Sequence, residues 1–416
     1  MPDATVDLPH WAARLLAERR QRGWSQKDLA KRLAQAAAKL GIPMPERTSL
    51  VRSIRNWEAG RYRPRDPYPV LLSRVFRLEE RELFADAVMP PGTDPAQVLA
   101  SILPEGELLA PLPTRGGRRV GMSTVTDLSA RVHGLRLADD VLGGDDLIGP
   151  AFRELNTAVR IYRESTHTDD VGRALLTTIG EYAQIAGWIA SDAGKHEQAA
   201  QTYRLGISAA REAGDRTLES NLIGSLSYQV ANIGDTYEGV QLSRAALDTA
   251  EPDAPALARA LAWDRLAWAH ARHNDAQAAM HALGEAETAL ASDHGPTAPS
   301  YLYWVDHGEL QVMEARVYTE LRRPLRAVPL LTDVLARYDT THARELALYL
   351  SWLAVALLDA NEPEEAADAA RRMCEVSADV ASDRTTTRTR LVLNRLEPYR
   401  DIAEVRDLLA RYPLSA

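Results

Sequence analysis

The chain has 416 residues, of which 45% are hydrophobic and 26% are charged, a composition typical of globular domains rather than disordered or fibrous proteins. Its single cysteine, Cys374, excludes an intramolecular disulfide and a cysteine-rich zinc site, and it fits a reducing cytoplasm. No apolar run approaches the roughly 20 residues that a membrane-spanning helix needs. Because the N-terminus also lacks a basic and apolar leader, we expect a cytoplasmic protein that makes no membrane contact.

Charge is distributed unevenly along the chain. Residues 1–86 contain 17 Lys and Arg against 11 Asp and Glu, whereas residues 87–416 contain 32 against 47, within an overall net charge of -9. A basic segment joined to an acidic one predicts that only residues 1–86 meet a polyanion. Small domains also vary by several charges by chance, so charge alone favours nucleic-acid binding without establishing it.

Residues 9–86 are predicted to form short helices separated by turns, the first of them over residues 9–21. Ser25 precedes Asp28 by three residues, which is the spacing of a capping box at the start of a second helix. The stretch 34–47 that follows is long for a connection, and its two prolines are expected to end any helix.

A third helix is expected to begin at a Thr48 or Ser49 N-cap and to run to Ala59, with a last helix over residues 68–75. Its apolar positions at i, i+4 and i+7 predict a buried stripe of Leu50, Ile54 and Trp57. The opposite face carries side chains that can pair with the edges of guanine and adenine, namely Arg52, Arg55 and Asn56. Arg61 and Arg63 follow at once and suit phosphate contacts.

This pattern resembles the Xre/Cro family of helix-turn-helix domains. The matching segments are Trp24–Ala30 (WSQKDLA), Ile54–Arg61 (IRNWEAGR) and Pro64. The resemblance implies a phosphate contact by Gln26, base contacts from the third helix, and a fixing role for Trp57-Glu58. We therefore expect the DNA-binding residues to be Gln26, Lys27, Ser49, Arg52, Arg55, Asn56, Arg61 and Arg63. The connection between the two signatures is longer than usual, as in a variant common in actinobacterial regulators with TPR repeats.

Residues 87–122 are rich in proline and glycine and predict a linker, with at most a short helix near residues 97–103. Residues 123–416 show helical patterns and no useful alternating pattern, so the protein is expected to be all-α. Turn signals recur in this part at spacings of 40, 40, 48 and 39 residues, at Gly194, Gly234, Asn274, Arg322 and Asn361. Glycine and asparagine suit the left-handed conformation that ends one helix before the next begins.

Small residues occur seven positions before and five positions after each turn. Those before are Gly187, Ser227, Ala267, Ala315 and Ala354, and those after are Ala199, Gly239, Ala279, Ala327 and Ala366. Two antiparallel helices need small residues where their backbones approach most closely. The pattern is similar to the tetratricopeptide (TPR) family, which implies a helical-repeat solenoid. Residues 124–179 are expected to form an N-terminal cap and the residues from 384 onward a C-terminal cap.

In TPR arrays the first helix of each hairpin lines the concave face. The position after the first small residue carries Trp188, Tyr228, Trp268, Arg316 and Val355, which suggests an aromatic ladder. With the polar residues of that face, the predicted effector-binding set is Gln184, Trp188, Asn221, Tyr228, Asp264, Trp268 and Arg316. Apolar walls with a few polar groups would suit a peptide or a small hydrophobic ligand. The alternative is that these aromatics pack between adjacent hairpins. Tyr301 and Tyr303 are expected to cover one end of the groove.

The sequence contains no phosphate-binding loop, no His-Glu-x-x-His motif and no paired cysteines, so no enzyme, cofactor or metal is expected. His270 and His273 share a helix face, but no third metal ligand is evident. We predict a homodimeric transcription regulator that binds double-stranded DNA through residues 1–86. The helical repeats in 123–416 would bind an effector, either a small molecule or a peptide, or a protein partner. The alternative is an adaptor that acts through protein contacts and does not read DNA sequence.

Overall fold

The computed structural model describes residues 10–22, 24–40, 42–76, 78, 83–84, 118–142, 144–233, 235–250, 254–292, 296–338, 342–378 and 382–413. This part of the chain is all-helical, apart from an isolated bridge between Arg119 and Thr166. None of its helices has both the length and the hydropathy needed to cross a bilayer. The helix expected near residues 97–103 lies outside the described residues.

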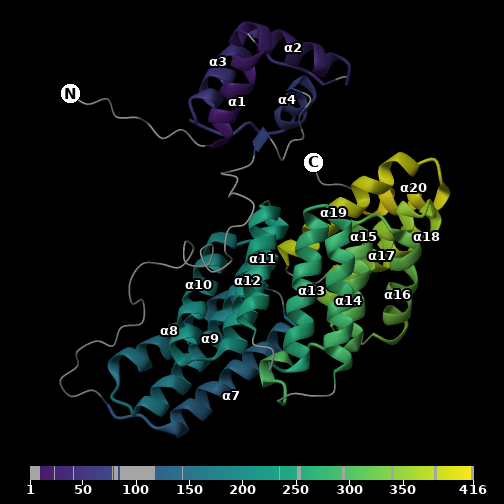
Figure 1. Cartoon of the computed structure of the whole chain (residues 1–416). Coiled ribbons are helices and arrows are strands. Elements are labelled where there is room, and N and C mark those ends of the chain that lie inside the picture. The colour runs from purple at the N-terminus through teal and green to yellow at the C-terminus, as the bar shows by residue number, and fades with distance from the viewer. Residues whose placement is uncertain are drawn as a thin grey trace, which may run out of the picture. The chain divides into compact units, whose positions relative to one another are not determined.

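The chain divides into two compact units, Met1–Thr93 and Asp94–Ala416, whose helices are labelled in Figure 1. The N-terminal unit contains α1 (His10–Gln21), α2 (Gln26–Ala38), α3 (Arg47–Glu58) and α4 (Tyr68–Phe76). These helices share one core, in which the stripe predicted on α3 is buried: Leu50, Ile54 and Trp57. The capping box is also confirmed, because the Ser25 hydroxyl accepts a hydrogen bond from the Asp28 amide and the Asp28 carboxylate accepts one from the Ser25 amide.

Two predicted boundaries in the N-terminal unit are wrong. α2 continues to Ala38 through an alanine-rich stretch and buries Ala37, because alanine has the highest helix propensity, so the connection to α3 is shorter than expected. α3 begins at Arg47, with Glu46 at its N-cap and no side-chain cap bond, so Thr48 and Ser49 lie exposed in the first turn instead of capping it. Pro45 is the last residue before α3 that disfavours a helix, and α3 begins two residues after it.

The C-terminal unit is a succession of helices joined mostly by short turns. In chain order they are α7 (Met122–Asp139), α8 (Gly144–Glu164), α9 (Asp169–Asp192), α10 (His196–Ala213), α11 (Arg216–Ile233), α12 (Thr236–Thr249), α13 (Ala256–Arg272), α14 (Ala276–Ala291), η1 (Ser300–Leu302), α15 (His307–Glu320), α16 (Pro324–Arg337), α17 (Ala343–Asp359), α18 (Pro363–Ser377), α19 (Asp383–Leu396), η2 (Glu397–Tyr399) and α20 (Ala403–Arg411). The pairs α9–α10, α11–α12, α13–α14, α15–α16 and α17–α18 pack as hairpins.

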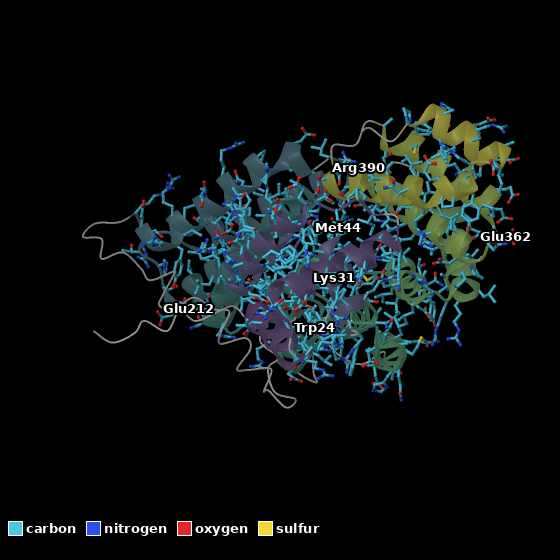
Figure 2. All side chains as sticks on the ribbon, turned by 90° about the horizontal axis from the view of Figure 1, so that it is seen from above. Trp24, Lys31, Met44, Glu212, Glu362 and Arg390 are labelled. Atoms are coloured by element: carbon cyan, nitrogen blue, oxygen red, sulfur yellow. The ribbon has the colours of Figure 1, made fainter. Side chains whose placement is uncertain are left out.

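The predicted turns lie where these hairpins reverse direction. Backbone φ angles are positive at Gly194, Asn274, Arg322 and Asn361, whereas Gly234 lies outside the described residues. Figure 2 marks one of these turns with Glu362, which follows Asn361 between α17 and α18. Arg322 adopts the left-handed conformation although its Cβ atom disfavours it. The turn therefore keeps its geometry at the one predicted position that lacks Gly or Asn.

The predicted small positions are buried where the two helices of a hairpin meet. In the α11–α12 hairpin, the Ser227 hydroxyl donates to the Gly239 carbonyl oxygen at 2.8 Å. A Cβ atom on Gly239 would lie 2.8 Å from the Ala231 Cβ atom and 3.1 Å from its Cα atom. The backbones of α11 and α12 are therefore too close for any side chain at residue 239.

The predicted N-terminal cap has a different boundary. α9 begins at Asp169, after a Thr168 N-cap, and runs without a break to Asp192, so the expected cap (124–179) cuts through it. Among the described residues of this unit, α7 and α8 are the helices that precede the first hairpin, and both pack against α9. The last helices, α19 and α20, cover α17 and α18 at the other end.

The C-terminal unit closes on itself. Arg344, in the first turn of α17, donates to both carboxylate oxygens of Asp139, the last residue of α7, at 3.1 and 3.0 Å. Asp192, the last residue of α9, lies 3.7 Å from the guanidinium of Arg344 and 3.6 Å from that of Arg384 on α19. The first helices of the unit thus contact the start of its last repeats. The inner helices α9, α11, α13, α15, α17 and α19 pack in succession, and side-chain contacts of Arg344 and Arg384 link the end of this array to α7 and α9.

We expect Gly239→Ala to lower the free energy of unfolding by about 1–2 kcal/mol, because overpacking against the Ala231 backbone outweighs the gain in helix propensity. Gly284, on the exposed side of α14, has nothing within 4 Å of its Cβ position, so Gly284→Ala should raise stability by about 0.5–1 kcal/mol. Urea denaturation of both variants measures the difference. Stabilisation by Gly239→Ala would show that α11 and α12 are not held at this separation.

Candidate functional site

The first candidate site is the exposed side of α3 in the N-terminal unit. Arg52 and Arg55 are exposed, and neither guanidinium makes a hydrogen bond or an ion pair with another described residue. They lie on the side of α3 opposite its buried stripe, so helix geometry points them away from the core. Lys27 and Ser49 are also exposed, on the first turns of α2 and α3. These four predicted residues remain available to a partner.

The other predicted DNA-binding residues already have contacts inside the unit. Asn56 donates to the Tyr62 hydroxyl at 3.1 Å and accepts a hydrogen bond from Arg61 at 3.4 Å. Arg63 donates to the carbonyl oxygen of Phe84 at 2.7 Å and lies over the ring of the same residue. The Arg63 side chain therefore contacts Phe84, whereas Arg61 is hydrogen-bonded to Asn56 at the C-terminal end of α3.

A buried carboxylate fixes α3 against the two helices before it. Glu58 is 6% exposed and accepts hydrogen bonds from the Arg19 guanidinium on α1, one of them at 2.9 Å. Gln26, at the start of α2, donates to the same carboxylate at 2.8 Å. The side chain expected to contact phosphate thus contacts Glu58 in this structure. Sequence reasoning expected Glu58 to hold α3 but missed Arg19, since nothing in the α1 pattern marks it.

The second candidate site is the inner face of the C-terminal unit. The predicted aromatic ladder is present: the ring centroids of Trp188 and Tyr228 are 5.9 Å apart, and those of Tyr228 and Trp268 are 6.2 Å apart. The ladder ends on Trp352 of α17, whose ring meets that of Trp268 edge-on at 5.7 Å. The first two contacts link the neighbouring repeats that contain α9, α11 and α13, and the third links α13 to α17, which belong to repeats separated by the α15–α16 hairpin.

Guanidinium groups lie between and over these rings. Arg316 lies 5.3 Å from the Tyr228 ring centroid, 4.7 Å from that of Trp268 and 5.3 Å from that of Trp352. Arg265 lies 4.3 Å from the Tyr228 centroid. Other arginines on the same ladder stack on its two ends: Arg384 at 5.2 Å from Trp188 and Arg388 at 3.7 Å from Trp352. Cations over ring faces are attracted by the ring quadrupole, more strongly where water is excluded.

Two acidic groups on this face, the buried Asp264 and the partly buried Glu309, have pKa values above their ordinary values. Asp264 is 3% exposed, and burial raises its pKa to about 7 although Arg265 and Arg316 act in the opposite direction. Burial also raises the pKa of Glu309, which accepts a hydrogen bond from the Tyr349 hydroxyl.

Tyr228 shows which sign of charge dominates the inner face. Burial alone would raise the pKa of its hydroxyl, but Arg316, Arg384 and Arg265 outweigh that effect and lower the pKa to about 8. The Arg316 guanidinium also donates a hydrogen bond to this hydroxyl. The three guanidinium groups therefore favour the ionised form of the Tyr228 hydroxyl.

The arrangement consists of stacked rings and the arginine side chains that lie over them. No protein-family model matches the chain, and no curated protein is significantly similar to it. The inner face must therefore be interpreted from its own residues. It is aromatic and rich in arginine, and it is largely filled by its own side chains.

The predicted effector-binding residues are brought together only in part. Trp188, Tyr228, Trp268 and Arg316 contact one another through the ladder, and Asp264 is buried beside it. Two further members, Gln184 and Asn221, lie on the inner helices α9 and α11 outside the ladder contacts. Asn221 lines a small cavity of about 10 Å³ between α11 and α13, which is room for about one water molecule.

The sequence suggested apolar walls with a few polar groups on this face, with packing of the aromatics between hairpins as the alternative, and the structure shows arginines lying over the rings. The inner helices carry long arginine side chains whose stems and guanidinium planes fill the space between the rings. Tyr303 does not cover a groove end, because its hydroxyl donates to Asp140 at 2.7 Å. Tyr301 is 3% exposed and lies near Arg136 of α7, so both tyrosines help to close the unit.

Sequence reasoning missed four residues of this face. Arg265 lies three positions before Trp268, and Trp352 lies three positions before the predicted Val355, which is one helical turn in each case. Both residues could therefore be predicted if the repeat pattern were extended by one helical turn on either side of the ladder position. Arg384 and Arg388 lie in the segment taken as a cap, and only the closure of the unit brings them to the ladder.

Replacing Glu58 should destabilise the N-terminal unit. We expect Glu58→Ala to lower the opening free energy of α3 by about 3 kcal/mol, because it leaves the largely buried Arg19 guanidinium without its carboxylate. Hydrogen–deuterium exchange of amides 47–58 in the full chain measures this. Glu46→Ala removes an exposed carboxylate at the start of α3 and should change it by no more than about 0.5 kcal/mol. Equal effects of the two variants would contradict the anchoring role.

Asp264 should make stability depend on pH. Its folded-state pKa of about 7 lies above the ordinary value of 3.8, so the stabilisation linked to its protonation is complete below pH 4 and is lost as pH rises through 7. Asp264→Asn cannot ionise, so relative to the wild type it should gain up to about 3 kcal/mol between pH 5 and pH 8. Urea denaturation at both pH values tests this, with the exposed Asp407→Asn as control. A parallel pH dependence of Asp264→Asn and wild type would refute it.

Proposed function

We propose that the protein is a DNA-binding transcription regulator. Its N-terminal unit would be a helix-turn-helix domain of the Xre/Cro type, and its C-terminal unit a TPR-like solenoid that responds to an effector. The observation that carries the proposal is the exposed, unpaired Arg52 and Arg55 on α3, a helix held by the buried Glu58.

Several features of the N-terminal unit support DNA binding. Ordering a long arginine side chain costs conformational entropy, and hydrogen bonds to a charged acceptor can offset that cost. Arg52 and Arg55 lie on one rigid face and have no partner among the described residues, so both are available to an external acceptor. Lys27 and Ser49 lie on helix starts in the same unit, where backbone amides and side chains suit phosphate oxygens. The excess of basic residues in 1–86 adds a sequence-independent attraction to DNA.

The C-terminal unit supports a sensing role through the contacts between its repeats. Helical repeats contact mainly their neighbours, so their curvature changes when the groups between them are rearranged. In this unit the inner rings and guanidiniums touch several repeats at once, and Arg316 alone contacts rings from α11, α13 and α17. A ligand on that face would alter the curvature of the C-terminal unit. The altered curvature would change how two chains pair, and so whether their N-terminal units can bind half-sites about one DNA turn apart.

The test is enrichment of genomic DNA fragments by the full-length protein, followed by binding of the enriched fragments at two salt concentrations. Arg52→Ala/Arg55→Ala should weaken specific binding at least tenfold, because each paired base contact contributes about 1–3 kcal/mol. The charge-matched control is Arg400→Ala/Arg406→Ala, two exposed arginines next to and within α20, which should bind as the wild type does.

If nothing is enriched, and all three proteins bind weakly and equally, the N-terminal unit is not a reader of DNA sequence. The protein would then act through protein contacts of its helical repeats, as an adaptor. Size measurement of the DNA complex against the free protein would show whether two chains occupy one site, which is the homodimer that the half-site geometry requires.

A further inference from the structure

Two of the arginines on the aromatic ladder belong to α19, which lies outside the five hairpins. The Arg384 guanidinium lies 5.2 Å from the Trp188 ring centroid on α9, and that of Arg388 lies 3.7 Å from the Trp352 centroid on α17. These arginines are four residues apart on one helix, so they lie on the same face of α19. The first half of α19, residues 383–390, thus presents two cations to rings from the first and the last hairpin.

The two halves of α19 are held in different ways. The second half buries apolar side chains in the core that α17 and α18 share, namely Val392, Leu393 and Leu396. The first half (DRTTTRTR) contains no apolar residue. Most of the stability of a helix in a protein comes from packing of its apolar face, so the first half of α19 depends mainly on polar and cation–ring contacts.

The polar contacts of the first half are incompletely satisfied. Arg388 donates to the hydroxyl and carbonyl oxygens of Ser351 at 3.0 and 3.5 Å, whereas Arg384 lies 3.6 Å from Asp192. The carboxylate oxygens of Asp192 and the hydroxyl of Thr385 are buried without a hydrogen-bond partner among the described residues. Buried polar groups without partners cost free energy, so these contacts hold the first half of α19 only weakly.

Docking of this segment also buries a cation close to other cations. Burial, together with the guanidiniums of Arg316 and Arg272, lowers the pKa of Arg388 to about 9, although Glu320 and Tyr228 act in the opposite direction. The other guanidiniums over the ladder, such as that of Arg316, come from the hairpins themselves. The first half of α19 is therefore the part of this cluster that can leave while the repeats and the second half of α19 stay in place.

We propose that the two ends of the ladder, Trp188 and Trp352, form a docking surface for a helix with two arginines one turn apart, and that the first half of α19 is its internal occupant. A partner segment of the same chemistry, a cationic helix with arginines at i and i+4, would replace Arg384 and Arg388. Such an exchange renews both cation–ring contacts and leaves the charge of the face unchanged. The inference names the effector class as a cationic helical peptide, and it rests on the proposed function for its regulatory meaning.

The test uses the full chain without DNA and a fluorescently labelled peptide of residues 382–396 as the probe, with binding followed by anisotropy. In the wild type, α19 competes with the peptide at an effective concentration on the order of 1 mM, so binding should be weak. Arg384→Gln/Arg388→Gln weakens this competitor and keeps both rings, so the peptide should bind this variant at least tenfold more tightly. Arg390→Gln/Arg400→Gln changes two exposed arginines, of which Figure 2 labels Arg390, and should bind the peptide as the wild type does.

A control peptide of the same composition moves the two arginines to another face of the helix (Arg384→Thr/Thr386→Arg/Arg388→Thr/Thr389→Arg). It should bind the Arg384→Gln/Arg388→Gln protein at least tenfold more weakly than the first peptide, because its arginines cannot reach both rings. No saturable binding of the first peptide to that protein, or equal binding of the two peptides, would overturn the proposal.

A disulfide tests whether peptide and α19 use the same surface. A Cβ atom on Gly194 would lie 3.6 Å from the Asp383 Cβ atom, a separation that a disulfide can span. Gly194→Cys/Asp383→Cys, added to Arg384→Gln/Arg388→Gln, should hold α19 in place when oxidised. The left-handed conformation of residue 194 is the same in both redox states, so its strain cancels in the comparison.

We expect the peptide to bind the reduced form of this protein at least tenfold more tightly than the oxidised form. Equal binding to the two forms would show that the peptide binds elsewhere, and would refute the shared surface. Because DNA enrichment is measured separately, peptide exchange without DNA binding would refute only the proposed function.

Discussion

The ion pairs around Arg344 determine the form of the C-terminal unit. Arg344 and Asp139 are separated by 205 residues, yet both oxygens of the carboxylate accept hydrogen bonds from the guanidinium, and both side chains are almost fully buried. Removing one member of such a pair leaves the other charged and dehydrated, a state that costs several kcal/mol. The pair therefore selects one relative placement of α7 and α17. The pair thereby holds the first helix of the repeat array against its last repeats.

Closure has an electrostatic consequence for the inner face. It brings Arg384 and Arg388, which lie on the last long helix, against rings contributed by α9 and α17. Water leaves the space between the repeats, and interactions among the remaining charges become stronger. Burial on this face raises the pKa of Asp264, and it also leaves the Arg316 Nε and the Trp268 indole nitrogen without an acceptor among the described residues.

The two units use buried acidic groups in the same way, to position arginines. In the N-terminal unit, Glu58 orders α1, α2 and α3 through Arg19 and Gln26, and this leaves Arg52 and Arg55 on a rigid exposed surface. In the C-terminal unit, Asp139 and Asp192 hold Arg344 and Arg384 at the closure. The proposed function depends on the first of these arrangements, because it needs a rigid recognition surface on the N-terminal unit.

Local chemistry made much of this architecture predictable from the sequence. The Ser25 capping box, the stripe of Leu50, Ile54 and Trp57, and the turns at Asn274 and Asn361 depend on residues a few positions apart, so their patterns are visible in the chain. The aromatic ladder followed from the repeat period. Contacts between distant residues were not visible: Arg344 with Asp139, Arg19 with Glu58, and Arg388 with Trp352. An ion pair or a stacked cation leaves no periodic signal, and only tertiary packing decides which arginine is buried beside which partner.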